Sequence, residues 1–454
     1  MYEERNMYHT MIRTRTYRYV LGLAFLLASV VKAQQAFDLS LDQALHIGFD
    51  KSKGLHASMM QVQYADAKSG EAGTLLLPSL KLGAAYTRLS SVPAFEVNIP
   101  LPPPAPSHFV LSPSILNNYN LRLTLQQPLF TGGKVQSAVD AADYTAQATQ
   151  KEYEKDKSDL VFNIKSAYWN LSKALELQNV VNENVEQIRA HVKDAKSWQS
   201  QGLITDNDVL KVEVQLSEAR LHQIDARNAV QLARIALNNV IGIPLDTPVN
   251  LTSTLDQKPE EFAPLPDLVK QALDRRADIE AMKYKVKAGE SGVSLATASW
   301  FPQVYLTGNY YFNRPNQRYQ PMVDQFNNSW DLGVGVSFDV WNWGATIHQT
   351  DEARARLAQA QDGLAQLKDA ITLDVTSNYL NLQRVRERID VAREGVKQAE
   401  ENYRITDNKF KQGLSVNTDL LDAEVALLKA KTDYTQALTD FELAEASLRR
   451  SIGE

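Results

Sequence analysis

The sequence lacks cysteine altogether, which excludes disulfides, thiolate metal sites and cysteine nucleophiles. Its seven histidines form no H-x-x-x-H pair, so we expect no zinc site. A glycine-rich nucleotide loop, a nucleophile elbow and a carboxylate pair placed for catalysis are also missing. We therefore predict no catalytic residues, no metal and no cofactor, and we expect that the protein is not an enzyme.

An excess of positive charge is lacking as well. The formal net charge of the 454 residues is −6, and no basic stripe runs along the chain. Proteins that bind nucleic acids usually carry such a stripe to contact phosphates. We therefore expect no nucleic-acid partner.

Long hydrophobic runs are absent beyond residue 33, whereas a membrane-spanning helix needs about 20 consecutive apolar residues. At the start of the chain, three arginines precede an apolar run at residues 19–31 and a small-x-small triplet. This order predicts a signal peptide over residues 1–33. A membrane anchor is the alternative, but the run is too short to cross a bilayer. An exported chain of this kind is periplasmic, secreted, or crosses an outer membrane as strands.

One stretch of the sequence is present twice. Gln201-Gly202-Leu203 returns as Gln412-Gly413-Leu414, and the register holds without a gap from residues 167–242 to residues 378–453. A register kept over that length predicts an internal duplication. Each copy sets a glycine between two long helical patterns, so we predict two helical-hairpin tips. Their turn residues are Gly202, Leu203, Gly413, Leu414 and Ser415.

Glycine and proline are absent from residues 134–199, which predicts one very long helix. Its counterpart in the second copy runs to Lys411. Shorter helices are predicted over residues 38–76, after the tip at 201–207 as far as Asn239, over 267–299, and up to Ile452. The last helix has an apolar seam with alternating spacings of three and four, which is typical of coiled-coil packing. The seam consists of Leu420, Ala423, Leu427, Ala430, Tyr434, Ala437, Phe441, Ala444 and Leu448.

Polar and apolar residues alternate in two segments of each copy, which predicts β-hairpins over residues 79–127 and 302–340. A proline-rich loop at residues 92–114 joins the first pair of strands. The predicted fold is thus mainly α with a small β part. The signal peptide is followed by a first repeat over 34–241, a linker over 242–266 with room for a short strand or helix, and a second repeat over 267–454.

Four strands cannot close on themselves, and an open sheet in lipid would leave backbone groups unpaired at both edges. Two chains would supply eight strands, whose interior is filled by side chains, whereas three would leave room for a channel. Five aromatic residues flank the strands on the helix side. They suit a girdle at the membrane interface or, alternatively, staple the strands to the helices of a soluble protein. These residues are Phe130, Trp300, Phe301, Trp341 and Trp343.

The duplicated order, the Pro-Leu-Phe-x-Gly-Gly stretch at residues 128–133 and the Gln-Gly-Leu-x-x-x-x-Asp tips resemble the TolC-like outer-membrane efflux protein family. The resemblance covers residues 36–453. It implies a homotrimer with a 12-stranded β-barrel in the outer membrane and a coiled-coil tunnel in the periplasm. It also implies a periplasmic adaptor protein and an inner-membrane pump of the RND or ABC type as partners.

The resemblance further implies a constriction ring just after the second tip. The matching residues are Asp419 and Asp422, and Asp208 is the equivalent of Asp419 in the first copy. The alternative for Asp419 and Asp208 is that each only caps a helix. The family's latch residues, an Arg and a Tyr, are replaced here by Ser415 and Phe410. Either other contacts close this tip, or it closes less firmly.

The sequence thus favours an exit duct that conducts passively from periplasm to exterior and is gated at its tips. A coiled-coil envelope scaffold without a pore is the alternative function. Drug efflux, metal efflux and protein secretion remain alternative uses of the duct.

Overall fold

The computed structural model describes residues 37–100, 102, 104, 108–253 and 262–454, so the predicted signal peptide lies outside the described residues. The chain forms two compact units, and each unit combines segments from both sequence copies. We call them the hairpin unit and the sheet unit. The hairpin unit comprises Met1–Lys53, Leu160–Glu260 and Asn381–Ser447, and the sheet unit comprises Gly54–Asp159, Glu261–Leu380 and Leu448–Glu454.

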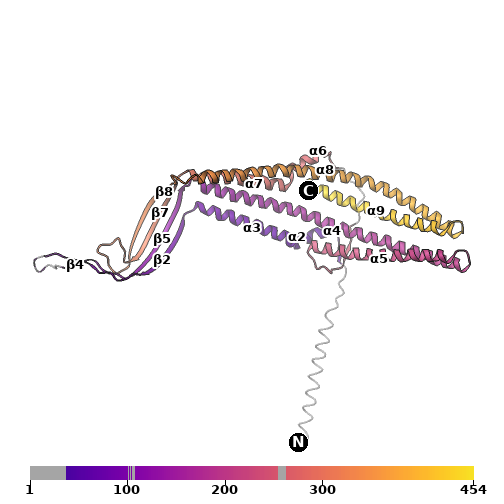
Figure 1. Cartoon of the computed structure of the whole chain (residues 1–454), viewed down its shortest axis with the longest axis horizontal. Helices are drawn as coiled ribbons and strands as arrows, with labels where there is room; N and C mark the ends of the chain where they lie inside the picture. Colours follow the sequence, from indigo (N-terminus) through magenta and orange to yellow (C-terminus); the bar gives the residue numbers. More distant parts are fainter. Residues whose placement is uncertain (1–36, 101, 103, 105–107, 254–261) are drawn as a thin grey trace, which may run out of the picture. The chain divides into compact units, whose positions relative to one another are not determined.

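The sheet unit contains a four-stranded antiparallel sheet in which the two sequence copies meet (Figure 1). Its strands are β2 (Ser79–Arg88), β5 (Asn117–Phe130), β7 (Gln303–Arg314) and β8 (Asn327–Ser337), in the order β2-β5-β7-β8. The pairing of β5 with β7 joins the first hairpin to the second. Among the described strands, β2 and β8 therefore have a neighbour on one side only.

The register of the strands separates apolar from polar side chains. Leu82, Leu123, Tyr310 and Trp330 lie on one face, because Leu82 pairs with Leu123, Leu123 with Tyr310, and Tyr310 with Trp330. The alternate positions carry polar or small residues on the other face, among them Lys81, Arg122, Thr124, Asn309 and Asp331. Strand side chains point alternately to the two faces, so the whole sheet is amphipathic.

The loop between β2 and β5 contains a further hairpin. Its strands are β3 (Phe95–Asn98) and β4 (His108–Ser112), which pair antiparallel. The predicted proline-rich loop over residues 92–114 therefore contains a hairpin that was not predicted. Short β-forming stretches, such as Phe-Glu-Val-Asn in β3, flank the prolines and can pair with each other because prolines are absent from both strands.

Two very long helices, α4 (Lys134–Ser200) and α8 (Ala345–Lys411), confirm the long helical prediction. Each has 67 residues and contributes to both units. In the sheet unit they accompany α3 (Lys53–Gly73) and α7 (Ala277–Thr297), which end in the 3-10 turns η1 (Thr74–Leu76) and η2 (Ala298–Trp300). Contacts such as the stacking of Tyr144 on Tyr284 join α4 to α7.

The helices predicted over residues 38–76 and 267–299 are each broken in two. The first splits into α2 (Leu41–Lys51) and α3 at Ser52, whose ψ of 112° is extended. The second splits into α6 (Leu265–Arg275) and α7 at Arg276. Arg276 leaves helical geometry and its guanidinium binds Asp278, Asp374 and the carbonyl of Ser451. The single-helix predictions were wrong because such tertiary contacts are invisible in a local pattern.

The hairpin unit is built from α5 (Asp206–Ile241) and α9 (Asn417–Ser451), each antiparallel to the second half of a long helix (Figure 1). The predicted seam of α9 is confirmed: most of its residues are buried and the others are half-buried. The linker contains a short strand, β6 (Val249–Leu251), as the sequence allowed, but its parallel pairing with β1 (Phe37–Leu39) was not predicted. No described helix combines the length and the hydrophobicity that crossing a bilayer requires.

Candidate functional site

The two tips of the hairpin unit share one backbone design. Gly202 and Gly413 both have a φ of 74°, a left-handed conformation that glycine adopts without strain. The amide of Leu203 donates to the carbonyl of Trp198, and the amide of Leu414 donates to that of Lys409. Both are the 6→1 hydrogen bonds of a Schellman motif, which ends a helix abruptly. Each long helix can therefore reverse direction within a few residues.

Asp208 caps the helix that follows the first tip. Its carboxylate accepts from the amide and hydroxyl of Thr205, at 3.2 and 2.7 Å, while the hydroxyl of Thr205 accepts from the amide of Asp208. This is a capping box. The hydrogen bonds from the hydroxyl and amide of Thr205, aided by the charge of Lys211, lower the pKa of Asp208. In the structure, Asp208 therefore stabilises the start of α5.

At the second tip, Asp419 also contacts the turn that precedes its helix. Its Oδ2 accepts from the Ser415 hydroxyl at 2.9 Å and from the Val416 amide at 3.4 Å. The side chain nevertheless remains exposed, and Asp422, three residues further on, is exposed too. Residues three apart lie on the same side of a helix, so the two carboxylates are neighbours on the surface of α9.

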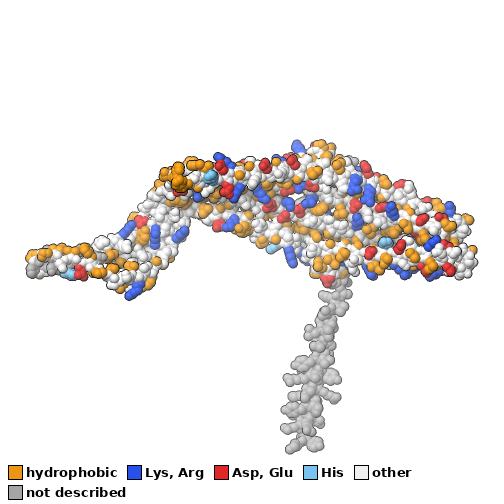
Figure 2. Space-filling view, viewed as in Figure 1, with side chains coloured by type: hydrophobic (Ala, Val, Ile, Leu, Met, Phe, Trp, Pro, Cys, Tyr) orange, Lys and Arg blue, Asp and Glu red, His pale blue; other side chains and the backbone are white. Residues whose placement is uncertain are grey.

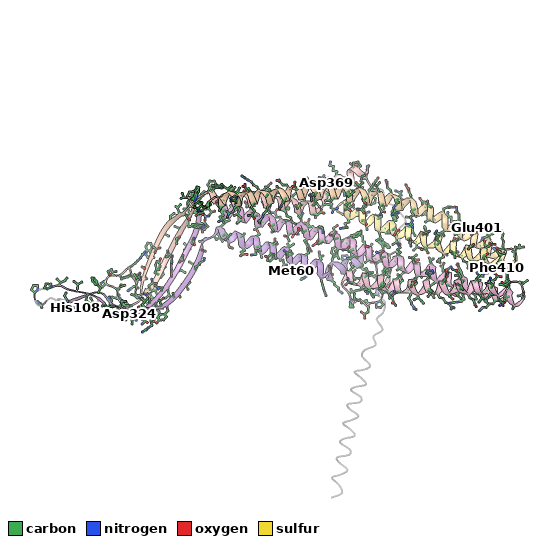
Figure 3. All side chains as sticks on the ribbon, viewed as in Figure 1. Met60, His108, Asp324, Asp369, Glu401 and Phe410 are labelled. Atoms are coloured by element: carbon green, nitrogen blue, oxygen red, sulfur yellow. The ribbon has the colours of Figure 1, made fainter. Side chains whose placement is uncertain are left out.

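Phe410 lies at the centre of an aromatic cluster next to the second tip. It is one of the largest fully buried side chains, with 1% exposure, and lies near the end of α8 (Figure 3). Its ring stacks on Trp198 at a centroid distance of 4.4 Å and meets the edge of His191 at 5.0 Å. Both partners belong to α4, so the cluster joins the two helical hairpins.

A buried polar network adjoins this cluster. His191 Nε2 lies 2.8 Å from Asn417 Oδ1, and His191 Nδ1 lies 3.3 Å from Glu424 Oε2. The amide nitrogen of Asn417 donates to the carbonyl of Asp208 at 3.2 Å. We call His191, Asn417 and Glu424 the tip network; each is at most 5% exposed. It links α4, α5 and α9, and so ties the first hairpin to the second.

The surroundings of the tip network are acidic. Burial, together with the nearby carboxylates of Asp407, Glu424 and Asp194, raises the pKa of Tyr403 to about 12. These groups come from α4, α8 and α9, so three helices contribute negative charge to one small volume. A cation in that volume is favoured.

Sequence reasoning missed the aromatic cluster and the tip network. His191 lies three residues after Ile188 and four before Ala195, on the buried side of α4. The sequence did contain one indication of this network: a histidine that falls at a buried position of the helical repeat, close to a tip. Its partners Asn417 and Glu424 lie more than 220 residues away in the sequence, so their identity depended on the packing of the hairpins.

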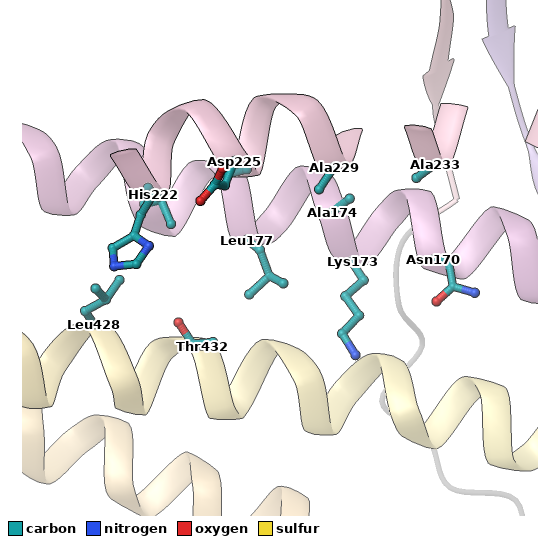
Figure 4. A pocket seen from close by; sticks show the side chains of 12 residues that line it. Asn170, Lys173, Ala174, Leu177, His222, Asp225, Ala229, Ala233, Leu428 and Thr432 are labelled. Carbon is teal, nitrogen blue, oxygen red and sulfur yellow. The ribbon is translucent and has the colours of Figure 1, made fainter. Parts of the chain in front are cut away.

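A groove of about 560 Å³ runs along α4, α5 and α9 in the hairpin unit (Figure 4). Its walls are mostly apolar, with Leu177, Ala229 and Leu428 among the lining residues, and polar groups at the rim include Lys173 and Asp225.

The five aromatic residues predicted as a girdle are all exposed in the sheet unit. Their exposed fractions range from 48% for Phe130 to 87% for Trp343. Trp341 and Trp343 meet edge to face at 5.8 Å. Figure 2 shows hydrophobic side chains gathered where β8 leads into α8. Exposed indoles in such number are unusual on a surface that faces only water.

Comparisons with known proteins agree with this architecture. The sequence model of the family described as "Outer membrane efflux protein" matches residues 50–243 and 268–454. Outer membrane efflux protein BepC of Brucella suis biovar 1 (strain 1330) is 23% identical over 333 residues, which cover 73% of this chain and 71% of that protein. Outer membrane protein TolC of Escherichia coli (strain K12) is 21% identical over 397 residues, covering 85% and 76%.

The structure of the outer membrane protein VceC from Vibrio cholerae superimposes with a TM-score of 0.76 at 21% identity, covering 91% of this chain and 96% of that one. This likeness confirms the predicted fold, mainly helical with a small β part. The family match extends over far more than half of the sequence. The chain therefore belongs to the outer membrane efflux protein family.

Proposed function

We propose that this protein is the outer-membrane exit duct of a tripartite efflux system or a type I secretion system. The observation that carries the proposal is the amphipathic sheet, with Leu82, Leu123, Tyr310 and Trp330 on one face and polar residues on the other. A sheet between lipid and a watery lumen needs one apolar and one polar face.

In this proposal three copies assemble around a common axis. The free edges of β2 and β8 pair between neighbouring copies and close a twelve-stranded sheet. Closure satisfies backbone groups that lipid would leave unpaired. The aromatic residues Trp341 and Trp343 then lie at the periplasmic edge of the lipid, where indole rings are favoured.

The tips of the hairpin unit form the proposed gate. In the trimer, Asp419 and Asp422 contribute six carboxylates to one opening and attract cations. The aromatic cluster around Phe410 and the tip network take the place of the missing family latch and hold the second hairpin to the first. Gly202 and Gly413 provide the turns about which each hairpin moves as one body.

The duct itself performs no chemistry and depends on partners for energy. We propose a periplasmic adaptor and an inner-membrane pump of the RND or ABC type. The apolar groove along α4, α5 and α9 and the exposed leucines Leu203 and Leu414 offer surfaces on which an adaptor helix could pack. A coiled-coil scaffold without a pore is the competing function, but it leaves the apolar face of the sheet without a purpose.

Oligomeric state and detergent dependence, measured together, test this proposal. The duct should purify from membranes only with detergent and should give the mass of three chains. A scaffold should fractionate without detergent. Recovery of a stable, detergent-independent monomer or dimer would reject the duct.

A further inference from the structure

We propose that His191 holds two ring protons and acts as a charged tether that keeps the gate closed, so that loss of one proton at alkaline pH opens it. The inference rests on the proposed duct function and specifies how its gate is regulated. It starts from the hydrogen bonds of the tip network, where the acceptors on both sides of the imidazole can be identified.

The orientation of Asn417 fixes the first ring proton. Its Nδ2 donates to the backbone carbonyl of Asp208, which is an acceptor only, so its Oδ1 must be the atom that faces His191. Oδ1 lies 2.8 Å from His191 Nε2 and can only accept. Nε2 therefore carries a hydrogen.

Glu424 accounts for the second proton. Its Oε1 and Oε2 both lie 3.3 Å from His191 Nδ1. A carboxylate accepts only, so Nδ1 carries a hydrogen as well and the ring is an imidazolium. Moving this proton to Glu424 would leave the number of protons in the pair unchanged. In either arrangement, removal of one proton leaves the Glu424 carboxylate facing the lone pair of His191 Nδ1, with no hydrogen between them.

Because both side chains are buried, loss of this proton is energetically unfavourable in the closed tip. The side chains of His191 and Glu424 are 2% and 1% exposed. Within the described residues, Oε1 of Glu424 forms no hydrogen bond, so His191 is the partner on which the carboxylate depends. A buried carboxylate without its counter-charge is strongly destabilised, and the hairpins can relieve it by separating and admitting water.

Most of the other ionisable groups on the packed helices are acidic and act in the same direction. Deprotonation of His191 removes a positive charge from an acidic environment, in which Lys411 is already paired with Asp407. The groups on the packed helices are Asp194 on α4, Asp208 on α5, Tyr403, Asp407 and Lys411 on α8, and Glu424 on α9.

The tip network is coupled to the proposed constriction through one helix terminus. Asn417 is the first residue of α9, and Asp419 and Asp422 follow within the first two turns. Separation of Glu424, eight residues into the same helix, from the deprotonated ring draws this part of α9 away from α4 and lets the carboxylates move apart. His191 does not line the opening, so it is a positioning residue, and its contribution should appear in the pH profile of gating.

The test is the open probability of the full-length protein in planar lipid bilayers from about pH 5 to about pH 9, which spans the range in which imidazoles titrate. We expect the wild-type open probability to rise about tenfold toward alkaline pH, a change of about 1.4 kcal/mol in the gating equilibrium. His191→Gln, which has no titrating ring, should give a flat profile. His56→Gln, at an exposed position on α3, is the matched control and should keep the wild-type profile.

Glu424→Gln provides a second, independent variant, since it removes the carboxylate that the charged ring neutralises; its profile should also be flat. If His191→Gln does not assemble, the wild-type profile and Glu424→Gln decide the question. A flat wild-type profile, or a pH response that survives both substitutions, overturns the inference while leaving the duct intact. Absence of any conductance at every pH rejects the duct itself, and the inference with it.

Discussion

The ring of Phe410 stacks on the indole of Trp198, with centroids 4.4 Å apart and ring planes 29° apart. This contact joins the end of α8 to the end of α4, and thus one tip to the other within the hairpin unit. A phenylalanine cannot supply the hydroxyl of the tyrosine expected at this position, so its contribution is packing rather than hydrogen bonding. The consequences can be measured by substitution.

Replacing Phe410 by alanine should loosen the second tip. Loss of a fully buried aromatic side chain costs about 3–5 kcal/mol of stability. We expect faster amide hydrogen exchange in residues 400–424 and a higher basal conductance. The control is Tyr64→Ala, because Tyr64 is 58% exposed on α3. Unchanged exchange in the Phe410 variant would show that the cluster does not hold the tip.

The carboxylates after the second tip should set ion selectivity. Asp419→Asn together with Asp422→Asn removes six negative charges from the proposed opening, so cation selectivity, measured as a reversal potential across a salt gradient, should fall. Asp369→Asn alters an exposed carboxylate elsewhere on α8 and serves as the control (Figure 3). Equal reversal potentials in all three proteins would argue that the ring does not face the lumen.

The cap at Asp208 should make the first tip sensitive to acid. Hydrogen bonds with Thr205 lower the pKa of Asp208, so the stabilising contribution is present above its unfolded pKa and is lost as pH falls through the folded one. The side chain is partly exposed, so solvent screening limits the effect to about 1 kcal/mol. Asp208→Asn should retain part of the cap and abolish the pH dependence of hydrogen exchange in α5. A persistent acid response would assign it to another group.

Two neighbouring glycines offer a matched pair of substitutions in the sheet unit. Gly132 and Gly133 both have positive φ, 61° and 85°, so alanine strains the backbone at either position. A Cβ at Gly132 would also lie 2.5 Å from Cβ of Phe301 and 2.9 Å from the carbonyl of Ala298, whereas one at Gly133 meets nothing within 4 Å.

Gly132→Ala should therefore be the more destabilising change, by about 1–3 kcal/mol for the added clash. The comparison is the thermal midpoint of the two variants in the same detergent. If both variants melt together, Phe301 moves freely and does not fix the junction between strands and helices.

The elements that could be predicted are those in which apolar residues recur at the spacing of a helix or a strand, or from which glycine and proline are absent. The absence of glycine and proline from residues 134–199 gave the length of α4 to within a residue, and alternation located β2 and β8. The break at Arg276 escaped prediction, because it is accompanied by contacts such as that of Arg276 with Asp374, 98 residues away. The tip network escaped for the same reason, since a histidine within a helical seam has no local partner.

Conductance of the purified protein in planar lipid bilayers tests the central claim most directly. The duct account predicts discrete single-channel events that depend on trimer formation and persist in the Gly133→Ala variant. A protein that binds the bilayer yet conducts under no pH, salt or voltage condition would contradict it.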